Sequence, residues 1–246
     1  MRVNCLIKCR NMTVIDSYDI LRRKKYMDTT VSKFVDLEDS ETKSIERIHV
    51  KDSFIYRFYS RTLDIVSSFI GLLIGIPLVI IFGFLIKLED GGPIFYKQER
   101  LGKDEKHFSI YKLRSMRVDA EKIGGAQWAQ KNDPRITKVG NFIRKTRIDE
   151  IPQLVNILKG DMSLIGPRPE RPELTYEFDK EIPGFLLRTA VKPGLTGLAQ
   201  VNGGYEISPE EKLKWDIEYI KNRNILMDLK ILFATVRVVL TGEGAR

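Results

Sequence analysis

The feature that most constrains this chain is a run of 22 residues without a charge, IVSSFIGLLIGIPLVIIFGFLI, at residues 65–86. At ~1.5 Å per residue, a helix of this length could span the ~30 Å hydrocarbon core of a bilayer. Pro77 stands just past the middle of the run, with three glycines around it. Because a proline inside a helix removes a backbone hydrogen bond, we expect the helix to break or bend there.

The charges on either side of this run bear on its orientation in a membrane. Both flanks are basic, whereas the positive-inside rule needs an excess of Lys and Arg on one side only. The residues alone therefore favour a re-entrant helix, which enters one leaflet, bends near Pro77 and returns. A helix that spans the bilayer is the alternative. The flanking cations are Lys51, Arg57 and Arg61 before the run and Lys87, Lys97, Arg100 and Lys103 after it.

The net charge of +8 predicts an anionic partner, namely nucleic acid, phospholipid headgroups or a phosphorylated substrate. Residues 94–150 hold 14 Lys and Arg against 8 Asp and Glu, so this segment carries most of the excess. A solvated basic face is the plain alternative. The sequence has no helix-turn-helix or RNP-like aromatic motif, and we therefore expect no nucleic-acid partner.

Cysteine and histidine are too few to build a metal site or a catalytic triad. Cys5 and Cys9 lack a second Cys/His pair for zinc, and a disulfide framework needs more cysteines. His49 and His107 are isolated in the sequence. The N-terminus lacks the apolar stretch of a secretory signal. We therefore expect free thiols in a reducing compartment and a protein that is not exported.

Composition divides the chain into a polar N-terminal extension at residues 1–52, a membrane-anchoring region at 53–90 and a catalytic region at 91–246. The fold class that we expect is α+β and mainly helical. Residues 94–98 and 107–113 are rich in Phe, Tyr and Ile and flank a polar stretch, which predicts a small β-hairpin.

Three helices are predicted in the catalytic region. Apolar residues at i, i+3, i+4 and i+7 predict a helix at 150–159, which Gly160 ends and Asp149 caps at its N-terminus. A Ser-Pro-Glu-Glu start signal predicts a second helix from Ser208. The very apolar residues 225–240 predict a third helix, either buried in the core or lying amphipathically at the membrane interface.

The segment TRIDEIPQL, at residues 146–154, sets two adjacent carboxylates, Asp149 and Glu150, just after a cluster of cations. Helix capping explains such a pair by itself. However, Arg144 lies just before the pair, and the GPRP segment holds Arg168 between two prolines. Arginines match phosphate oxygens, and carboxylates beside them could hold a divalent cation or attack phosphorus. With the apolar run, this pattern predicts a phosphorylated substrate handled at a lipid surface.

Four long motifs of this chain resemble those of the bacterial sugar transferases, the monotopic phosphoglycosyl transferases. The motifs occur in the family's order, and the resemblance extends over residues 56–240. They are GGPIFYKQERLGKDEKHFSIYKLRSM at 91–116, DPRITKVGNFIRKTR at 133–147, RKTRIDEIPQLVNILKGDMSLIGPRPE at 144–170 and VKPGLTGLAQVNG at 191–203.

The resemblance implies an enzyme that moves a sugar 1-phosphate from a UDP-sugar to polyprenyl phosphate, such as undecaprenyl phosphate, and releases UMP. It implies a re-entrant helix bent at Pro77 that anchors the enzyme in the inner leaflet, with the catalytic part on the cytoplasmic face. By motif position, Asp149 matches the nucleophile that forms a phosphosugar-aspartyl intermediate. Glu150 matches its partner, and both carboxylates are candidate ligands of a Mg²⁺ cofactor. The candidate phosphate-binding residues are Arg144, Arg168, Lys112 and Arg114, with Gln98 and Arg100 beside them.

Two other functions fit the same residues. One is a membrane-associated glycosyltransferase that releases UDP, and the other is a non-catalytic membrane protein that binds lipid headgroups. The sugar stays open, because many members of the family have an arginine after Asn202 where this chain has Gly203, Gly204 and Tyr205. A homo-oligomer is also left open by the sequence.

Overall fold

The computed structural model describes residues 34–35, 45–46, 48, 50, 52–120, 133–203 and 207–241. The chain forms two compact units, Met1–His49 and Val50–Arg246. In the first unit, strands β1 (Phe34–Val35) and β2 (Ile45–Glu46) pair antiparallel. The expectation for Cys5 and Cys9, and most of that for the polar extension, lies outside the described residues.

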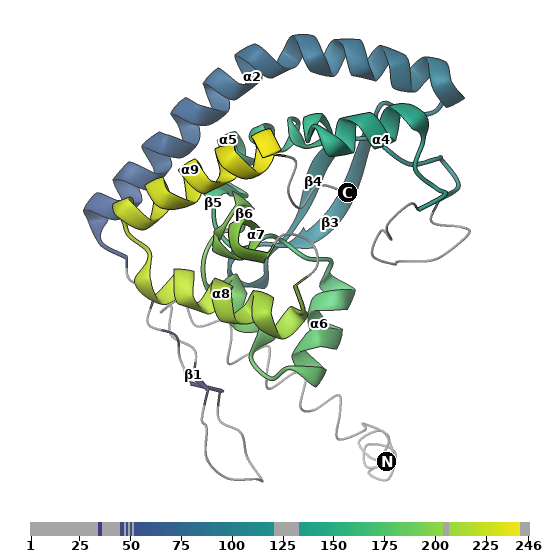
Figure 1. Cartoon of the computed structure of the whole chain (residues 1–246). Helices are drawn as coiled ribbons and strands as arrows, with labels where there is room; N and C mark the ends of the chain where they lie inside the picture. The colour runs from purple at the N-terminus through teal and green to yellow at the C-terminus, as the bar shows by residue number, and fades with distance from the viewer. Residues whose placement is uncertain are drawn as a thin grey trace, which may run out of the picture. The chain divides into compact units, whose positions relative to one another are not determined.

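The elements of the second unit confirm a mainly helical protein with small sheets (Figure 1). The α-helices are α2 (Phe54–Asp90), α4 (Lys138–Lys145), α5 (Gln153–Lys159), α6 (Pro172–Glu181), α7 (Leu198–Gly203), α8 (Pro209–Asn222) and α9 (Ile225–Thr241). The 3₁₀ helices are η1 (Lys103–Glu105), η2 (Ile148–Glu150) and η3 (Phe185–Ala190). The strands are β3 (Phe95–Leu101), β4 (His107–Leu113), β5 (Ser163–Ile165) and β6 (Gly194–Thr196).

Helix α2 contains the whole apolar run and extends it in both directions. The Ser53 side chain accepts a hydrogen bond from the Tyr56 backbone N–H at the start of the helix, and Gly91 ends it with φ of 70°. Pro77 lies inside the helix and does not end it; the ribbon is curved but continuous (Figure 1). Within the described part of the chain, α2 is the one helix long and apolar enough to cross a membrane.

Polar groups attach α2 to the rest of the unit on both sides of its uncharged run. Arg61 donates hydrogen bonds of 2.8 and 2.7 Å to the last carbonyls of α5. The Asp64 carboxylate accepts hydrogen bonds from the Ser163 hydroxyl and the Leu164 N–H of β5. Near the other end of α2, Glu89 accepts bonds of 2.8 and 3.1 Å from the first N–H groups of α4. Both halves of α2 therefore contact the same body of protein.

Two glycines of α2 permit this close packing. A Cβ atom added at Gly75 would lie 2.6 Å from the Ile151 side chain, and one at Gly71 would lie 2.8 Å from the Leu154 side chain. The segment that follows the two carboxylates therefore lies directly on α2. On the opposite side, α2 leaves large apolar side chains uncovered. These exposed residues include Phe69, Leu73, Ile74, Ile80, Ile81, Phe84 and Leu88.

Helix α9 is not a buried core helix, which was one of the two predictions for it. Only one side of α9 is packed, where Ile231 is buried and Asp228 accepts hydrogen bonds from the hydroxyls of Tyr56 and Tyr219. The other side exposes Leu226, Phe233, Val236 and Val239. In its apolar exposure α9 thus resembles α2.

The small sheets include one expected and one unexpected pairing. Strands β3 and β4 form the predicted antiparallel hairpin, with Phe95 opposite Leu113 and Leu101 opposite His107. Strands β5 and β6 pair in parallel, which the sequence did not predict. The start of α8 is as predicted, because the Ser208 hydroxyl accepts a hydrogen bond from the Glu211 N–H.

Candidate active site

The predicted N-cap role of Asp149 is wrong. Helix α5 begins at Gln153 with Pro152 as its cap residue, and Asp149 and Glu150 lie earlier, in η2. A capping side chain needs an extended backbone next to the first N–H groups of the helix, whereas these residues form a 3₁₀ turn. The predicted C-terminal stop is confirmed, since Gly160 has φ of 89°.

The turn between α4 and α5 orients the two carboxylates. Arg147, which stands between α4 and η2, has a left-handed backbone with φ of 56°, an uncommon conformation for a residue with a side chain. The following turn brings Asp149 and Glu150, which are only 7% and 8% exposed, to the wall of a cavity. Asp149 and Glu150 are therefore two buried acids in a cavity wall, and they do not cap helix α5.

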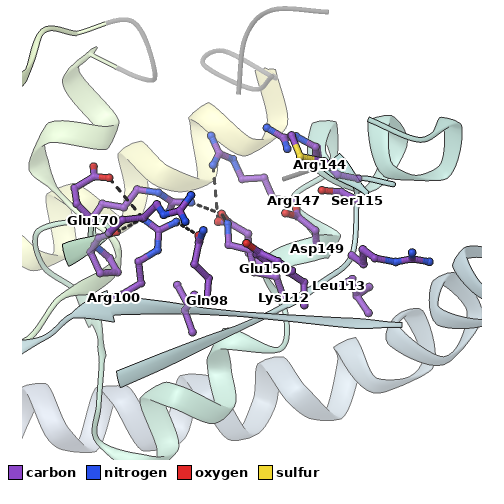
Figure 2. A pocket seen from close by; sticks show the side chains of 18 of the residues that line it. Gln98, Arg100, Lys112, Leu113, Ser115, Arg144, Arg147, Asp149, Glu150 and Glu170 are labelled. Atoms are coloured by element: carbon purple, nitrogen blue, oxygen red, sulfur yellow. Dashed lines mark hydrogen bonds and ion pairs between the residues drawn. The ribbon is translucent and has the colours of Figure 1, made fainter. Parts of the chain in front are cut away.

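The cavity has a volume of about 440 Å³ and a wall rich in cations. Strands β3 and β4 form one side, and η2 and the GPRP segment form another (Figure 2). All six candidate catalytic and phosphate-binding residues line the cavity. One of them, Arg114, also pairs with Asp90 at the end of α2. The lining cations are Arg100, Lys112, Arg114, Arg117, Arg135, Arg144, Arg147, Arg168, Arg171 and Lys212.

Glu150 lies at the centre of the cationic group (Figure 2). Its Oε1 atom accepts two hydrogen bonds, one of 2.9 Å from Lys112 and one from Arg168. The Arg147 guanidinium lies 4.0 Å from the other oxygen, Oε2. Burial raises the pKa of Glu150, but the charges of Arg168 and Lys112 outweigh burial and hold the pKa well below its usual range. Glu150 is therefore an ionised carboxylate, bound by its neighbours.

Asp149 is in a different electrostatic state from its neighbour. Its side chain makes no hydrogen bond or ion pair with any residue that the structure describes. Burial raises its pKa to about 6; the charge of Lys112 opposes this rise, and that of Glu150 adds to it. Asp149 therefore has free oxygen lone pairs and ionises close to neutral pH, which suits a nucleophile.

A buried layer behind the cavity wall supports Arg168. Arg188, in η3, donates a hydrogen bond of 2.9 Å to the Arg168 carbonyl and forms an ion pair of 2.7 Å with Asp216 of α8. Glu170 lies among Arg100, Arg188 and Lys212, and although burial raises its pKa, these charges, with that of Lys212 the largest, lower it to about 2. This layer fixes the backbone that carries the arginine nearest to Glu150.

Some of these residues were missed by the sequence reading. Arg188 and Asp216 lie in segments without a chemical motif, and they meet only through the tertiary fold. Glu170 had a local signal, because it directly follows the GPRP segment. Of the predicted residues, Arg144 lines the cavity next to Asp149, and its charge lowers the Asp149 pKa.

A family model described as bacterial sugar transferase matches residues 55–242. The chain belongs to the bacterial sugar transferase family. The match covers the second unit almost entirely, including α2, both cavity-forming strands and the pair of buried acids.

Several curated proteins are similar to this sugar transferase. A UDP-N-acetylgalactosamine-undecaprenyl-phosphate N-acetylgalactosaminephosphotransferase from Aeromonas hydrophila is 48% identical over 195 residues, which cover 78% of this chain and 46% of the relative. An undecaprenyl-phosphate galactose phosphotransferase from Salmonella typhimurium is 38% identical, covering 96% of this chain and 51% of the relative. The chain thus spans about half the length of these two relatives. The exopolysaccharide production protein PSS from Rhizobium leguminosarum is 40% identical over 193 residues, which cover 75% of this chain and 96% of the relative.

Asp149 and Glu150 are two side chains of the sugar transferase that could bind Mg²⁺ in the cavity. No group of three or more His, Cys, Asp or Glu side chains that could enclose a metal occurs among the described residues. Mg²⁺ is commonly held by one or two carboxylates together with substrate phosphates and water. Asp149, with its free oxygens, and the adjacent Glu150 offer such an incomplete set. These two carboxylates would therefore need phosphate and water ligands to complete a Mg²⁺ site.

Proposed function

We propose that the chain transfers a sugar 1-phosphate from a UDP-sugar to polyprenyl phosphate, such as undecaprenyl phosphate, and releases UMP. The observation that carries the proposal is the pair of buried acids, one bound and one free, in a cavity rich in cations. The names of the Aeromonas and Salmonella relatives support the lipid acceptor, and they name different sugars. The proposal is therefore limited to the class of donor. The product would begin the synthesis of a surface glycan.

In the first step, a carboxylate oxygen of Asp149 attacks the β-phosphorus of the donor. An Asp149–phosphorus bond forms, the bond from that phosphorus to the bridging oxygen breaks, and UMP leaves with the bridging oxygen. Lys112, Arg144 and Arg168 stabilise the negative charge that develops on the phosphate oxygens. The intermediate is a sugar phosphate joined to Asp149 as an acyl phosphate, a mixed anhydride, as expected from nucleophilic catalysis in two steps.

In the second step, an oxygen of polyprenyl phosphate attacks the same phosphorus. The Asp149–phosphorus bond breaks, the carboxylate is regenerated, and the product is a polyprenyl diphosphate sugar. Glu150 stays ionised throughout because Arg168 and Lys112 hold it in that state, and it keeps these cations directed at the cavity. Asp149 and Glu150 would hold the Mg²⁺, which supplies further positive charge for the diphosphate.

The rate of the first step is expected to rise with pH through a midpoint near 6. Asp149 attacks only as a carboxylate, and burial raises its pKa to about 6, so the reactive fraction grows as the pH passes that value. Single-turnover release of UMP between pH 5 and 8 measures this. Lys112→Gln is expected to move the midpoint to higher pH, because the Lys112 charge lowers the Asp149 pKa. A flat profile for the unaltered protein would contradict the assignment.

We also propose that α2 is re-entrant and that α9 lies at the surface of the same leaflet, with the catalytic unit on the cytoplasmic face. Arg61 and Glu89, which lie 28 positions apart on α2, both contact the polar body of the unit. A helix perpendicular to the bilayer would separate these two residues by the thickness of the hydrocarbon core. The exposed apolar side chains of α2 and α9 would face the lipid.

Cysteine labelling tests this topology. Arg57→Cys and Lys97→Cys, at exposed positions on either side of the apolar run, are made in a chain whose Cys5 and Cys9 are serine. Both are expected to react with a membrane-impermeant maleimide in inside-out vesicles and to be protected in intact cells. Permeabilised cells give the total labelling for each variant. If the two positions react from opposite sides, α2 spans the bilayer and the re-entrant proposal fails.

Nucleotide release by the detergent-purified protein tests the reaction itself. The protein is incubated with Mg²⁺ and a panel of UDP-sugars, with and without undecaprenyl phosphate. Sustained UMP release with one or two donors in the presence of the lipid is expected. Release of UDP would show ordinary glycosyl transfer, and no nucleotide release with any donor would contradict catalysis of this class.

A further inference from the structure

The cavity opens over a rim that is mostly apolar. Among the described residues that line the cavity, the exposed ones are Pro93, Phe95, Arg117 and Val118. Phe95 is 49% exposed and Val118 is 65% exposed. The remaining lining residues are buried or half-buried. A ligand that enters between these four side chains would therefore touch three apolar groups and one cation before it meets the interior.

This rim lies next to the C-terminal end of α2. It begins at Pro93, three residues after α2 ends at Asp90. Val118 packs on the turn that follows α2, since a Cβ atom added at Gly92 would lie 2.5 Å from the Val118 side chain. The last turns of α2 expose Phe84 and Leu88 on their way to this turn. Exposed apolar side chains thus occur on the last turns of α2 and again at the rim, with the charged residues Lys87, Glu89 and Asp90 around the end of the helix.

The interior of the cavity has the opposite character. Beyond the rim lie Lys112, Arg144 and Arg168, which surround the two acids. The change from apolar rim to cationic interior complements a molecule with a hydrocarbon tail and a phosphate head. A sugar nucleotide has only its base to place against apolar side chains and is polar over the rest of its length. The acceptor lipid has both features.

We infer that the isoprenoid tail of the acceptor lipid lies against Pro93, Phe95 and Val118, while its phosphate passes Arg117 into the cavity. This inference rests on the proposed function and adds an acceptor-specific site to it. The lipid would move from the bilayer around α2 onto the rim without its tail becoming exposed to water. Phe95 and Val118 would contact the acceptor and leave the donor untouched.

Because the two half-reactions can be measured separately, a double variant tests the inference. Phe95→Gln with Val118→Asn removes apolar surface from the rim, and both positions are exposed enough to accept a polar side chain. Phe233→Gln on α9 is the matched control, since Phe233 is 75% exposed and does not line the cavity. UMP release without acceptor reports the donor step. Steady-state transfer to undecaprenyl phosphate in nanodiscs then gives kcat and KM for the acceptor.

The rim variant is expected to release UMP at the unaltered rate without acceptor. Its KM for undecaprenyl phosphate should rise roughly tenfold, as expected from lost apolar burial. The control should change this KM less than twofold. An unchanged acceptor KM in the rim variant would overturn the inference, and so would a donor step slowed as much as the overall reaction. If the unaltered protein releases no UMP with any donor, the proposed function itself fails, and the inference with it.

Discussion

Asp149→Asn is expected to abolish UMP release, with a loss of roughly a thousandfold or more. The carboxamide has nearly the shape of the carboxylate but cannot attack phosphorus. Because the Asp149 side chain makes no hydrogen bond or ion pair with any described residue, the substitution breaks no contact that the fold needs. The loss would therefore report chemistry and not misfolding.

The melting temperature of Asp149→Asn distinguishes a loss of the nucleophile from misfolding. The folded-state pKa of Asp149 is raised to about 6, so folding is favoured while this group is protonated, and that contribution is lost as the pH rises through about 6. A neutral asparagine avoids the buried charge. At pH 7.5 the variant should therefore melt at the same temperature as the unaltered protein or at a higher one.

Mass spectrometry of the intact protein completes the test. Incubation with the correct donor and no acceptor should add the mass of one sugar phosphate to the unaltered protein and nothing to Asp149→Asn. Glu150→Gln is the neighbouring control, because it leaves the nucleophile in place. An Asp149→Asn variant that keeps UMP release within tenfold of the unaltered rate would rule out the aspartyl intermediate.

Local patterns in the sequence were sufficient to predict helix α2 and the β3–β4 hairpin. The uncharged run indicated α2, and two segments rich in Phe, Tyr and Ile on either side of a polar stretch indicated the β3–β4 hairpin. The run did not give the ends of α2, because the helix continues through charged residues that bind the rest of the unit, such as Arg61 and Glu89. The parallel β5–β6 pair was missed, since three-residue strands carry no period and their pairing depends on distant segments.

The candidate site was also predicted only in part from the sequence. Asp149, Glu150, Arg144 and Arg168 lie within 25 positions of one another, and the motif that holds them was visible as a cluster of charges. The error about Asp149 arose because a carboxylate before a proline is typical of a helix start, whereas the left-handed Arg147 and the 3₁₀ turn moved the start to Gln153. Spacing alone does not distinguish these two turns.

The support behind Arg168 predicts the second large effect. Arg188→Met is expected to lower the free energy of unfolding by about 3–5 kcal/mol, because it leaves the carboxylate of Asp216 buried without its cation. Both side chains are almost inaccessible, at 4% and 1% exposed. Burial already raises the Asp216 pKa although the charges of Arg188 and Lys212 oppose it, so removing Arg188 leaves Lys212 alone to oppose the effect of burial. Chemical denaturation monitored by circular dichroism measures the loss.

A double variant distinguishes a purely structural role of Arg188 from a role in positioning Arg168. Arg188→Met with Asp216→Leu removes both charges, and apolar replacement of a buried ion pair is often neutral or stabilising, so most of the lost stability should return. Glu170 would still be bound by Arg100 and Lys212. The hydrogen bond from Arg188 to the Arg168 carbonyl would stay broken, however, and with it the restraint on the arginine that binds Glu150. We therefore expect a stable protein whose kcat/KM for the donor is reduced roughly tenfold. Full activity in the double variant would mean that Arg188 acts on stability alone, because the Arg168 backbone would then be held without it.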